Sequence, residues 1–120
     1  MREIKFRIWN GAKSFCTDDF VKDNLFNFLE SDPELVTQFT GLKDKNGKEI
    51  YEGDIDSNYD VVAWCEKRNG WSMWTYDHPT KEYISCNCYQ CEGNFELSDL
   101  TVGQSEIEII GNIYENLGLL

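Results

Sequence analysis

The amino-acid sequence predicts an α+β fold: a mostly antiparallel β meander, of the kind that curls into a small barrel, with one N-terminal helix at about residues 17–31. Short segments of alternating polar and apolar residues are separated by turn dipeptides, of which Asn46-Gly47 and Asn69-Gly70 are the clearest. One segment instead repeats its apolar residues at helical spacing. The length of 120 residues and the hydrophobic content of 41% indicate one ordered domain over residues 1–120.

The first predicted strand covers residues 3–9. Polar and apolar residues alternate there, so Ile4, Phe6 and Ile8 are expected to face the core from one side of the strand. The dipeptide Asn10-Gly11 is then expected to turn the chain.

The predicted helix begins at Thr17 or Asp18, either of which is a suitable N-cap, and Pro33 ends it near Ser31. Phe26 lies off the apolar stripe and is expected to be exposed or to contact another element. We expect the stripe itself to pack on the core, the alternative being a partner-binding helix. The stripe consists of Phe20, Val21, Leu25, Phe28 and Leu29.

Turn residues separate the remaining predicted strands. Asn46-Gly47 is expected to form a type I′ hairpin turn, because Asn and Gly tolerate positive φ at both central positions. The spacing of the turns resembles that of SH3-like barrels. The predicted strands cover residues 35–39, 49–51, 61–65, 71–76, 81–86 and 106–114.

The charge balance is strongly acidic, with 22 acidic against 11 basic residues and a net charge of −11. Bulk electrostatics therefore oppose binding to nucleic acid or to an anionic membrane. No apolar run reaches the length needed to cross a bilayer, and no leader peptide is recognisable.

No Lys or Arg follows Lys81, so an acidic face is expected on the C-terminal third. Such a face either keeps the protein soluble or binds a basic partner. Aromatic side chains often anchor interfaces. The candidate partner-binding residues are Glu82, Glu92, Glu96, Asp99, Glu106 and Glu108, with Trp71 and Trp74.

Three separated motifs resemble, in the same order, those of the YopX family of small phage and prophage proteins. They are MREIKFRIW at residues 1–9, TGLKDKNGKEIYEGDI at residues 40–55 and IIGNIYEN at residues 109–116. Asp56 follows the second motif, where the family usually has an apolar residue. The resemblance implies a single YopX-like domain and location in the cytoplasm of an infected or lysogenic bacterium, where thiols are reduced. It implies no activity, so function must be inferred from the region outside the motifs.

Five cysteines are unusual for a reduced compartment. Cys86, Cys88 and Cys91 lie within one short segment. Cys65 ends the predicted strand 61–65, and the hairpin that follows leads the chain back toward this segment. Four thiolates suit a structural zinc ion, which would also order a segment poor in apolar residues. The lone histidine, His78, is the competing fourth ligand.

Two other interpretations of the cysteines stay open: thiols without a metal, and disulfides. Cys16 precedes the predicted helix and is expected to take no part in the site. Enzymatic activity is not expected, because the sequence has one histidine, no glycine-rich phosphate loop and no distinctive pair of carboxylates.

These observations lead to one preferred hypothesis. The chain is expected to be a monomeric, non-enzymatic binding protein that inhibits a host nucleic-acid-binding defence protein, as anti-CRISPR proteins do, for example by blocking DNA loading of Cas9. It would carry structural zinc and contact neither nucleic acid nor membrane directly. The alternative is a zinc-containing nucleic-acid-binding or regulatory module of phage, although no continuous basic track supports it. An enzyme is the third possibility.

Overall fold

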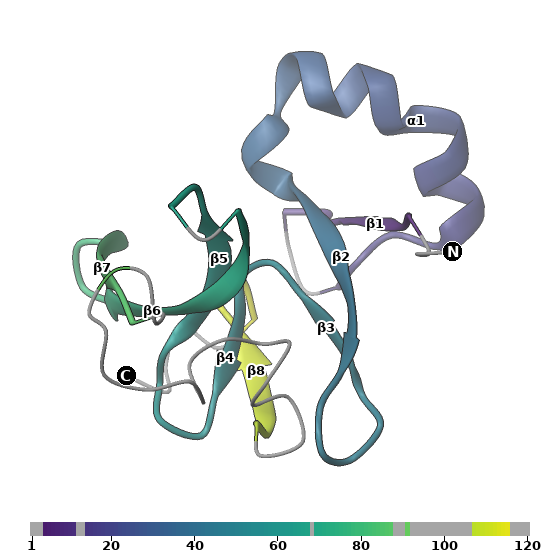
Figure 1. Cartoon of the computed structure of the whole chain (residues 1–120). Coiled ribbons are helices and arrows are strands. Elements are labelled where there is room, and N and C mark those ends of the chain that lie inside the picture. The colour runs from purple at the N-terminus through teal and green to yellow at the C-terminus, as the bar shows by residue number, and fades with distance from the viewer. Residues whose placement is uncertain (1–3, 12–13, 68, 88–90, 92–106, 116–120) are drawn as a thin grey trace.

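The chain forms two antiparallel sheets and one α-helix (Figure 1). The structure is a computed structural model that describes residues 4–11, 14–67, 69–87, 91 and 107–115. It confirms the predicted α+β class with antiparallel strands and one N-terminal helix. The elements are β1 (Phe6–Ile8), α1 (Asp18–Ser31), the 3-10 helix η1 (Pro33–Leu35), β2 (Val36–Lys43), β3 (Glu49–Tyr51), β4 (Asp54–Asp56), β5 (Val61–Cys65), β6 (Gly70–Asp77), β7 (Glu82–Cys86) and β8 (Ile109–Asn112).

The strand order is β1-β2-β3 in the first sheet and β7-β6-β5-β4-β8 in the second. Strands β4 to β7 form the predicted meander, and β8 returns to pair with β4. Among the residues that the structure describes, both sheets are open, since β1 and β3 in the first sheet and β7 and β8 in the second each have one neighbour.

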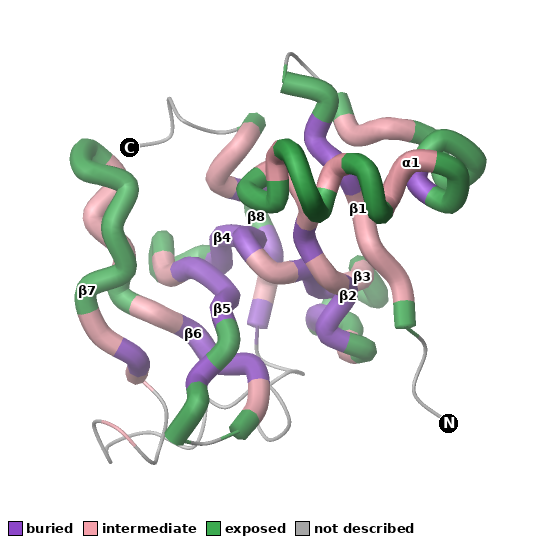
Figure 2. Tube along the Cα trace, turned by 90° about the horizontal axis from the view of Figure 1, so that it is seen from above, coloured by how far each residue is buried: buried purple, intermediate pink, exposed green. Residues whose placement is uncertain are grey.

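Helix α1 has the predicted bounds. The Thr17 side chain accepts a hydrogen bond from the backbone N–H of Phe20 (3.3 Å) and so acts as the N-cap. Pro33 begins η1 and ends the helix. The helix arches over β1 and β2 and buries only Val21, so much of its outer surface is exposed (Figures 1 and 2).

Two expectations about apolar packing need correction. Ile4 is 75% exposed, because β1 begins only at Phe6 and Ile4 precedes the sheet. The apolar stripe of α1 is only partly buried, with Phe20 and Leu29 at 40% and 42% exposure.

The hairpin at Asn46-Gly47 is confirmed, but its turn is not of type I′. Gly47 has positive φ (+83°), whereas Asn46 does not. The Asp44 carboxylate accepts the N–H groups of Asn46 and Lys48, both at 2.9 Å, and the Asp44 carbonyl accepts that of Gly47. This is a three-residue loop with one left-handed glycine, selected by the aspartate two residues before the dipeptide.

A second turn repeats this arrangement between β4 and β5. The Asp56 carboxylate accepts the N–H groups of Asn58 and Asp60, both at 3.0 Å, and Tyr59 takes the positive φ (+62°). Asp56 is thus a buried turn-forming acceptor.

Both turns also hold the chain at β8. The second carboxylate oxygen of Asp44 accepts the N–H of Ile109 (2.9 Å), and the N–H of Ser57 donates to the Glu108 carbonyl (3.0 Å). The C-terminal strand is therefore fixed by hydrogen bonds to both turns as well as by its pairing with β4.

The main hydrophobic cluster joins the two sheets. Trp71, which the sequence offered as a candidate partner-binding residue, belongs to it and is only 7% exposed, so the structure places this side chain in the core. Its side chain lies on the core face of β6, like that of Met73 two residues later. The buried members are Ile50, Val62, Trp71, Met73, Ile107 and Ile109.

Arg7 forms a second link between the sheets. Its guanidinium donates to the Asp54 carboxylate (2.6 Å) and to the Thr37 hydroxyl (3.0 Å). The aromatic rings of Phe15 and Tyr51 lie 4.2 and 4.4 Å from the guanidinium carbon. The ion pair is largely withdrawn from solvent, with side-chain exposures of 15% for Arg7 and 2% for Asp54.

Replacing Arg7 should therefore be costly. Arg7→Met leaves the buried Asp54 without its counter-charge, and we expect a loss of about 3–5 kcal/mol in the free energy of unfolding, measured by urea denaturation. Lys5→Met is the matched control, because the Lys5–Glu49 pair is about one-third exposed and should contribute less than about 1 kcal/mol. Equal losses of stability in the two variants would contradict the conclusion that the Arg7–Asp54 ion pair stabilises the fold more than the exposed Lys5–Glu49 pair does.

The turn between β4 and β5 predicts that the stability of the folded protein depends on pH. Burial, and then the neighbouring Asp56 charge, raise the pKa of Asp60 from 3.8 to about 6. Between about pH 4 and pH 6 the folded state keeps this proton while the unfolded chain loses it, so the contribution of Asp60 to stability falls as pH rises. Asp60→Asn should raise the melting temperature at pH 7 and leave it unchanged near pH 3.5. The exposed strand variant Glu82→Gln, melted over the same pH range, should show no such rise at pH 7.

Candidate metal centre

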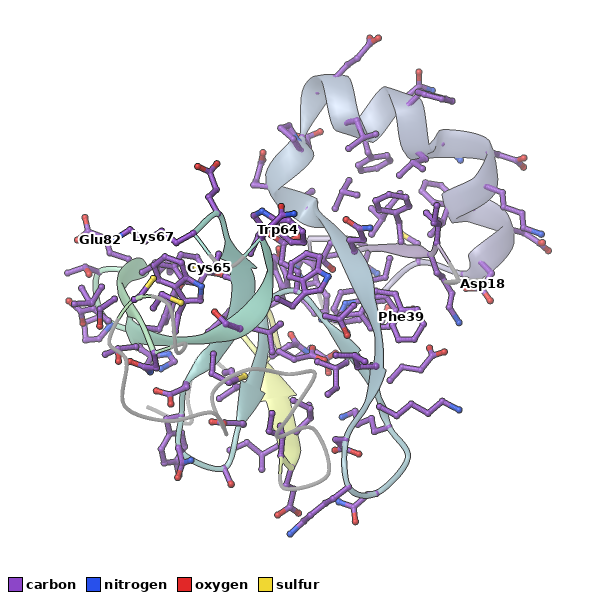
Figure 3. All side chains as sticks on the ribbon, viewed as in Figure 1. Asp18, Phe39, Trp64, Cys65, Lys67 and Glu82 are labelled. Carbon is purple, nitrogen blue, oxygen red and sulfur yellow. The ribbon has the colours of Figure 1, made fainter. Side chains whose placement is uncertain are left out.

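Three cysteine thiols meet on one face of the second sheet. Cys65 ends β5, Cys86 ends β7, and Cys91 follows five residues later. Their sulfur atoms all lie within 4.8 Å of one another, and those of Cys65 and Cys91 are 3.5 Å apart. Cys65 and Cys86 are 2% and 4% exposed, and Cys91 is half-buried. In Figure 3, sulfur atoms gather beside the labelled Cys65.

Strand β6 lies between the two buried cysteines and makes this approach possible. Cys65 is paired with Gly70 and Cys86 with Trp74, so the strand register places both thiols on the same face. Gly70 has no side chain, and Ser72, next on that face, is small. The Ser72 hydroxyl lies 2.9 Å from the Cys86 sulfur. Because these residues are small, the side chains of Cys65 and Cys86 can reach each other over β6, the strand that separates them.

Trp74 packs against Cys65 and Cys86 from the same face. Its indole N–H is buried, and in the described part of the chain it has no hydrogen-bond partner. A buried donor without an acceptor costs about 1–3 kcal/mol. An electron-rich thiolate, as in a metal-bound cysteine, is an acceptor for such a donor, so this environment fits a thiolate site.

The thiols border an open surface hollow of about 600 Å³. Lys67 and Trp64 line the same hollow. Glu66 lines the same hollow with the opposite charge, so the case for a metal ion depends on the thiols themselves.

The donor set fits zinc. A tetrahedral zinc ion with Zn–S bonds of about 2.3 Å places its sulfur ligands about 3.8 Å apart. The observed separations, with one at 3.5 Å and none above 4.8 Å, lie close to this spacing. Three of the four predicted ligands are thus brought together, and such a site would tie β5 and β7 to the segment after β7.

Cys88 and His78 are the remaining candidates for the fourth ligand, and the structure describes only His78. Cys88 lies outside the described residues, so its role stays a prediction. His78 lies outside the thiol cluster: its Nε2 is 3.1 Å from the Tyr59 carbonyl oxygen, and its ring packs edge-on against Tyr76 at 4.7 Å. Cys16 likewise lies outside the cluster, before α1.

The predicted acidic partner surface is only partly described. Glu82 is exposed at the start of β7, and Glu108 lies 3.5 Å from the ammonium of Lys45. Trp74 is half-buried against the cysteines, so it is tied to the candidate metal centre. The residues outside the described part are Glu92, Glu96, Asp99 and Glu106.

A model of the YopX protein family matches residues 3–120 of this chain. The chain belongs to the YopX family. The match confirms the resemblance carried by the three motifs and extends it across the cysteine-rich region. A search among curated proteins found no match. In the described part of this YopX-family protein, no helix is both long and apolar enough to cross a bilayer.

Sequence reasoning missed Ser72 and the role of Trp74 in this YopX-family protein. Both lie on the face of β6 that carries the cysteines. The available signal was the alternation Gly70, Ser72, Trp74, in which Gly70 and Trp74 are the strand partners of the two cysteines and the small Ser72 lies between them on the same face. Using it requires the register of three strands, which the sequence does not state.

The cluster predicts metal binding that depends on these thiols. Purified protein should contain about one zinc per chain by elemental analysis, and cobalt in its place should give thiolate charge-transfer absorption. Cys65→Ser and Cys91→Ser should each abolish that absorption and lower the melting temperature. Cys88→Ser tests the fourth ligand in the same way.

Cys16→Ser is the matched control and should keep both metal and stability. A metal content unchanged in Cys65→Ser and Cys91→Ser would remove the site.

Proposed function

We propose that this YopX-family protein is a non-enzymatic, phage-encoded acidic binding protein that inhibits a host nucleic-acid-binding defence protein and is stabilised by structural zinc. The net charge of −11 carries the proposal. A protein of this charge repels nucleic acid and attracts the basic surfaces on which nucleic-acid-binding proteins hold their ligands.

The candidate metal centre supports a structural rather than a catalytic role for zinc. The ligands offered here are thiols alone, and with Cys88 as fourth ligand the set would be the four-cysteine set typical of structural zinc. The lone histidine is placed away from the thiols, against the Tyr59 carbonyl. In the sequence the cluster ends at Cys91, immediately before the acidic residues 92–108, so a metal there would fix the start of that segment.

The target we propose is a nuclease with a basic channel, such as Cas9 with its guide RNA. The protein would act as an anti-CRISPR-like inhibitor that occupies the channel and blocks loading of target DNA. It would act as a monomer in the cytoplasm of the infected or lysogenic host. No reaction is needed, because occupancy of the channel suffices.

A zinc-containing nucleic-acid-binding module is the second candidate, favoured by one observation. Trp64 is 39% exposed and lines the cysteine hollow together with Lys67. An exposed aromatic ring beside a basic residue is the arrangement on which single-stranded bases stack. The overall negative charge opposes this alternative.

Two measurements on the purified protein test the proposal. Increasing protein should block binding of labelled target DNA to the Cas9–guide complex, and rising salt should weaken the block. Alone, the protein should not shift DNA or RNA in a gel. A variant in which Glu92, Glu96, Asp99 and Glu106 become Gln should inhibit less, because it lacks much of the C-terminal charge.

Undisturbed DNA loading at saturating protein would contradict inhibition of this target. A gel shift of DNA or RNA that is lost in Trp64→Ala would instead support the nucleic-acid-binding module.

A further inference from the structure

The outward face of α1 exposes large apolar side chains. Phe26 is 82% exposed, more than any other large hydrophobic residue in the described part of the chain. Leu29, one helical turn further on, is 42% exposed. Residues three apart on a helix lie side by side, so Phe26 and Leu29 form a continuous apolar spot. Figure 2 shows the outer turns of α1 facing solvent.

Carboxylates surround this spot. Asp23 lies one turn before Phe26, Glu30 one turn after it, and Asp19 two turns before it, all exposed. Among the described residues none of these three carboxylates has an ion pair or a side-chain hydrogen bond. Lys22 is the only basic residue of α1.

Helix stability does not account for this arrangement. Asp19 lies in the first turn, where an acidic side chain is favourable. Glu30, however, lies at the C-terminal end, where the helix dipole disfavours a negative charge, and the last turn has no basic residue. An exposed phenylalanine gains nothing from burial and has lower helix propensity than Lys, Glu or Gln. Glu30 and Phe26 thus suit a binding surface better than they suit the isolated helix.

We infer that this face of α1 docks a basic amphipathic segment of the partner protein. Apolar side chains of that segment would cover Phe26 and Leu29, and its Lys or Arg side chains would pair with Asp19, Asp23 and Glu30. An aromatic centre within a charged rim is typical of interface anchors. The same charges oppose an anionic membrane and nucleic acid. The inference rests on the proposed function and places one contact with the partner on α1, in addition to the acidic C-terminal third.

A synthetic amphipathic peptide of leucine and lysine is the probe, and a serine and lysine peptide of equal charge is its control. Binding to the intact protein is measured by fluorescence anisotropy. Native protein should bind the leucine and lysine peptide more tightly. Phe26→Ala and Glu30→Lys should each weaken that binding at least about tenfold, as expected for an anchor and for a reversed rim charge.

Matched controls come from β7. Ile84→Ala removes another exposed apolar side chain (57% exposed), and Glu82→Lys reverses a charge on the C-terminal third. Ile84→Ala should bind within about twofold of native protein, and Glu82→Lys tests whether the C-terminal third also binds the probe. Circular dichroism and thermal melts confirm that all variants fold; the high exposure of Phe26 predicts that they do.

Two results would overturn the inference: unchanged affinity in Phe26→Ala and Glu30→Lys, or equal binding of the two peptides by native protein. Weakening by Glu82→Lys alone would move the contact to the C-terminal third and leave the proposed function standing. Conversely, loss of peptide binding in the α1 variants, with no effect of native protein on Cas9, would support the docking face and overturn the proposed target.

Discussion

The buried ion pair between Arg7 and Asp54 is the constraint on which the arrangement of the two sheets depends. Arg7 belongs to β1 and Asp54 to β4, so the pair connects the first sheet to the second. Phe15 and Tyr51 enclose the guanidinium, and the rings of Phe15 and Tyr114 meet at 6.1 Å. The three motifs that mark the family therefore converge here: Arg7 comes from the first, Tyr51 and Asp54 from the second, and Tyr114 from the third. Two charges withdrawn from water require each other, which explains why distant segments must meet at this point.

The candidate metal centre lies on a different part of the fold. It is built on β5, β6 and β7, outside the three motifs, and depends on the register that aligns Cys65 and Cys86 across β6. The Arg7–Asp54 ion pair and the turns at Asp44 and Asp56 hold the fold without using the cysteines. Strands β5, β6 and β7 can therefore form a separate site. Zinc, where bound, would join β5 and β7 through side chains rather than through strand pairing.

The negative charge of the protein has two distinct uses. Asp44, Asp54 and Asp56 are buried and accept backbone N–H groups, so their charges serve the fold. Burial alone would raise the pKa of Asp44, but its three backbone donors bring that pKa below its ordinary value. The charge available to a partner comes instead from exposed side chains such as Asp23 and Glu30 on α1. The acidic composition therefore indicates the kind of partner, while burial decides which carboxylates can reach it.

Local features were readable from the sequence because their causes lie within a few residues. Thr17 and Pro33 set the ends of α1, and Asn46-Gly47 marked a hairpin, although the Asp44 side chain decided its turn type. Longer-range features needed the tertiary structure. Trp71 and Trp74 lie on opposite faces of one strand, and alternation alone does not say which face meets the core. Likewise, Cys86 and Cys91 are close in sequence, but only the pairing of three strands brings Cys65 to them, because register is fixed by side-chain packing across the whole sheet.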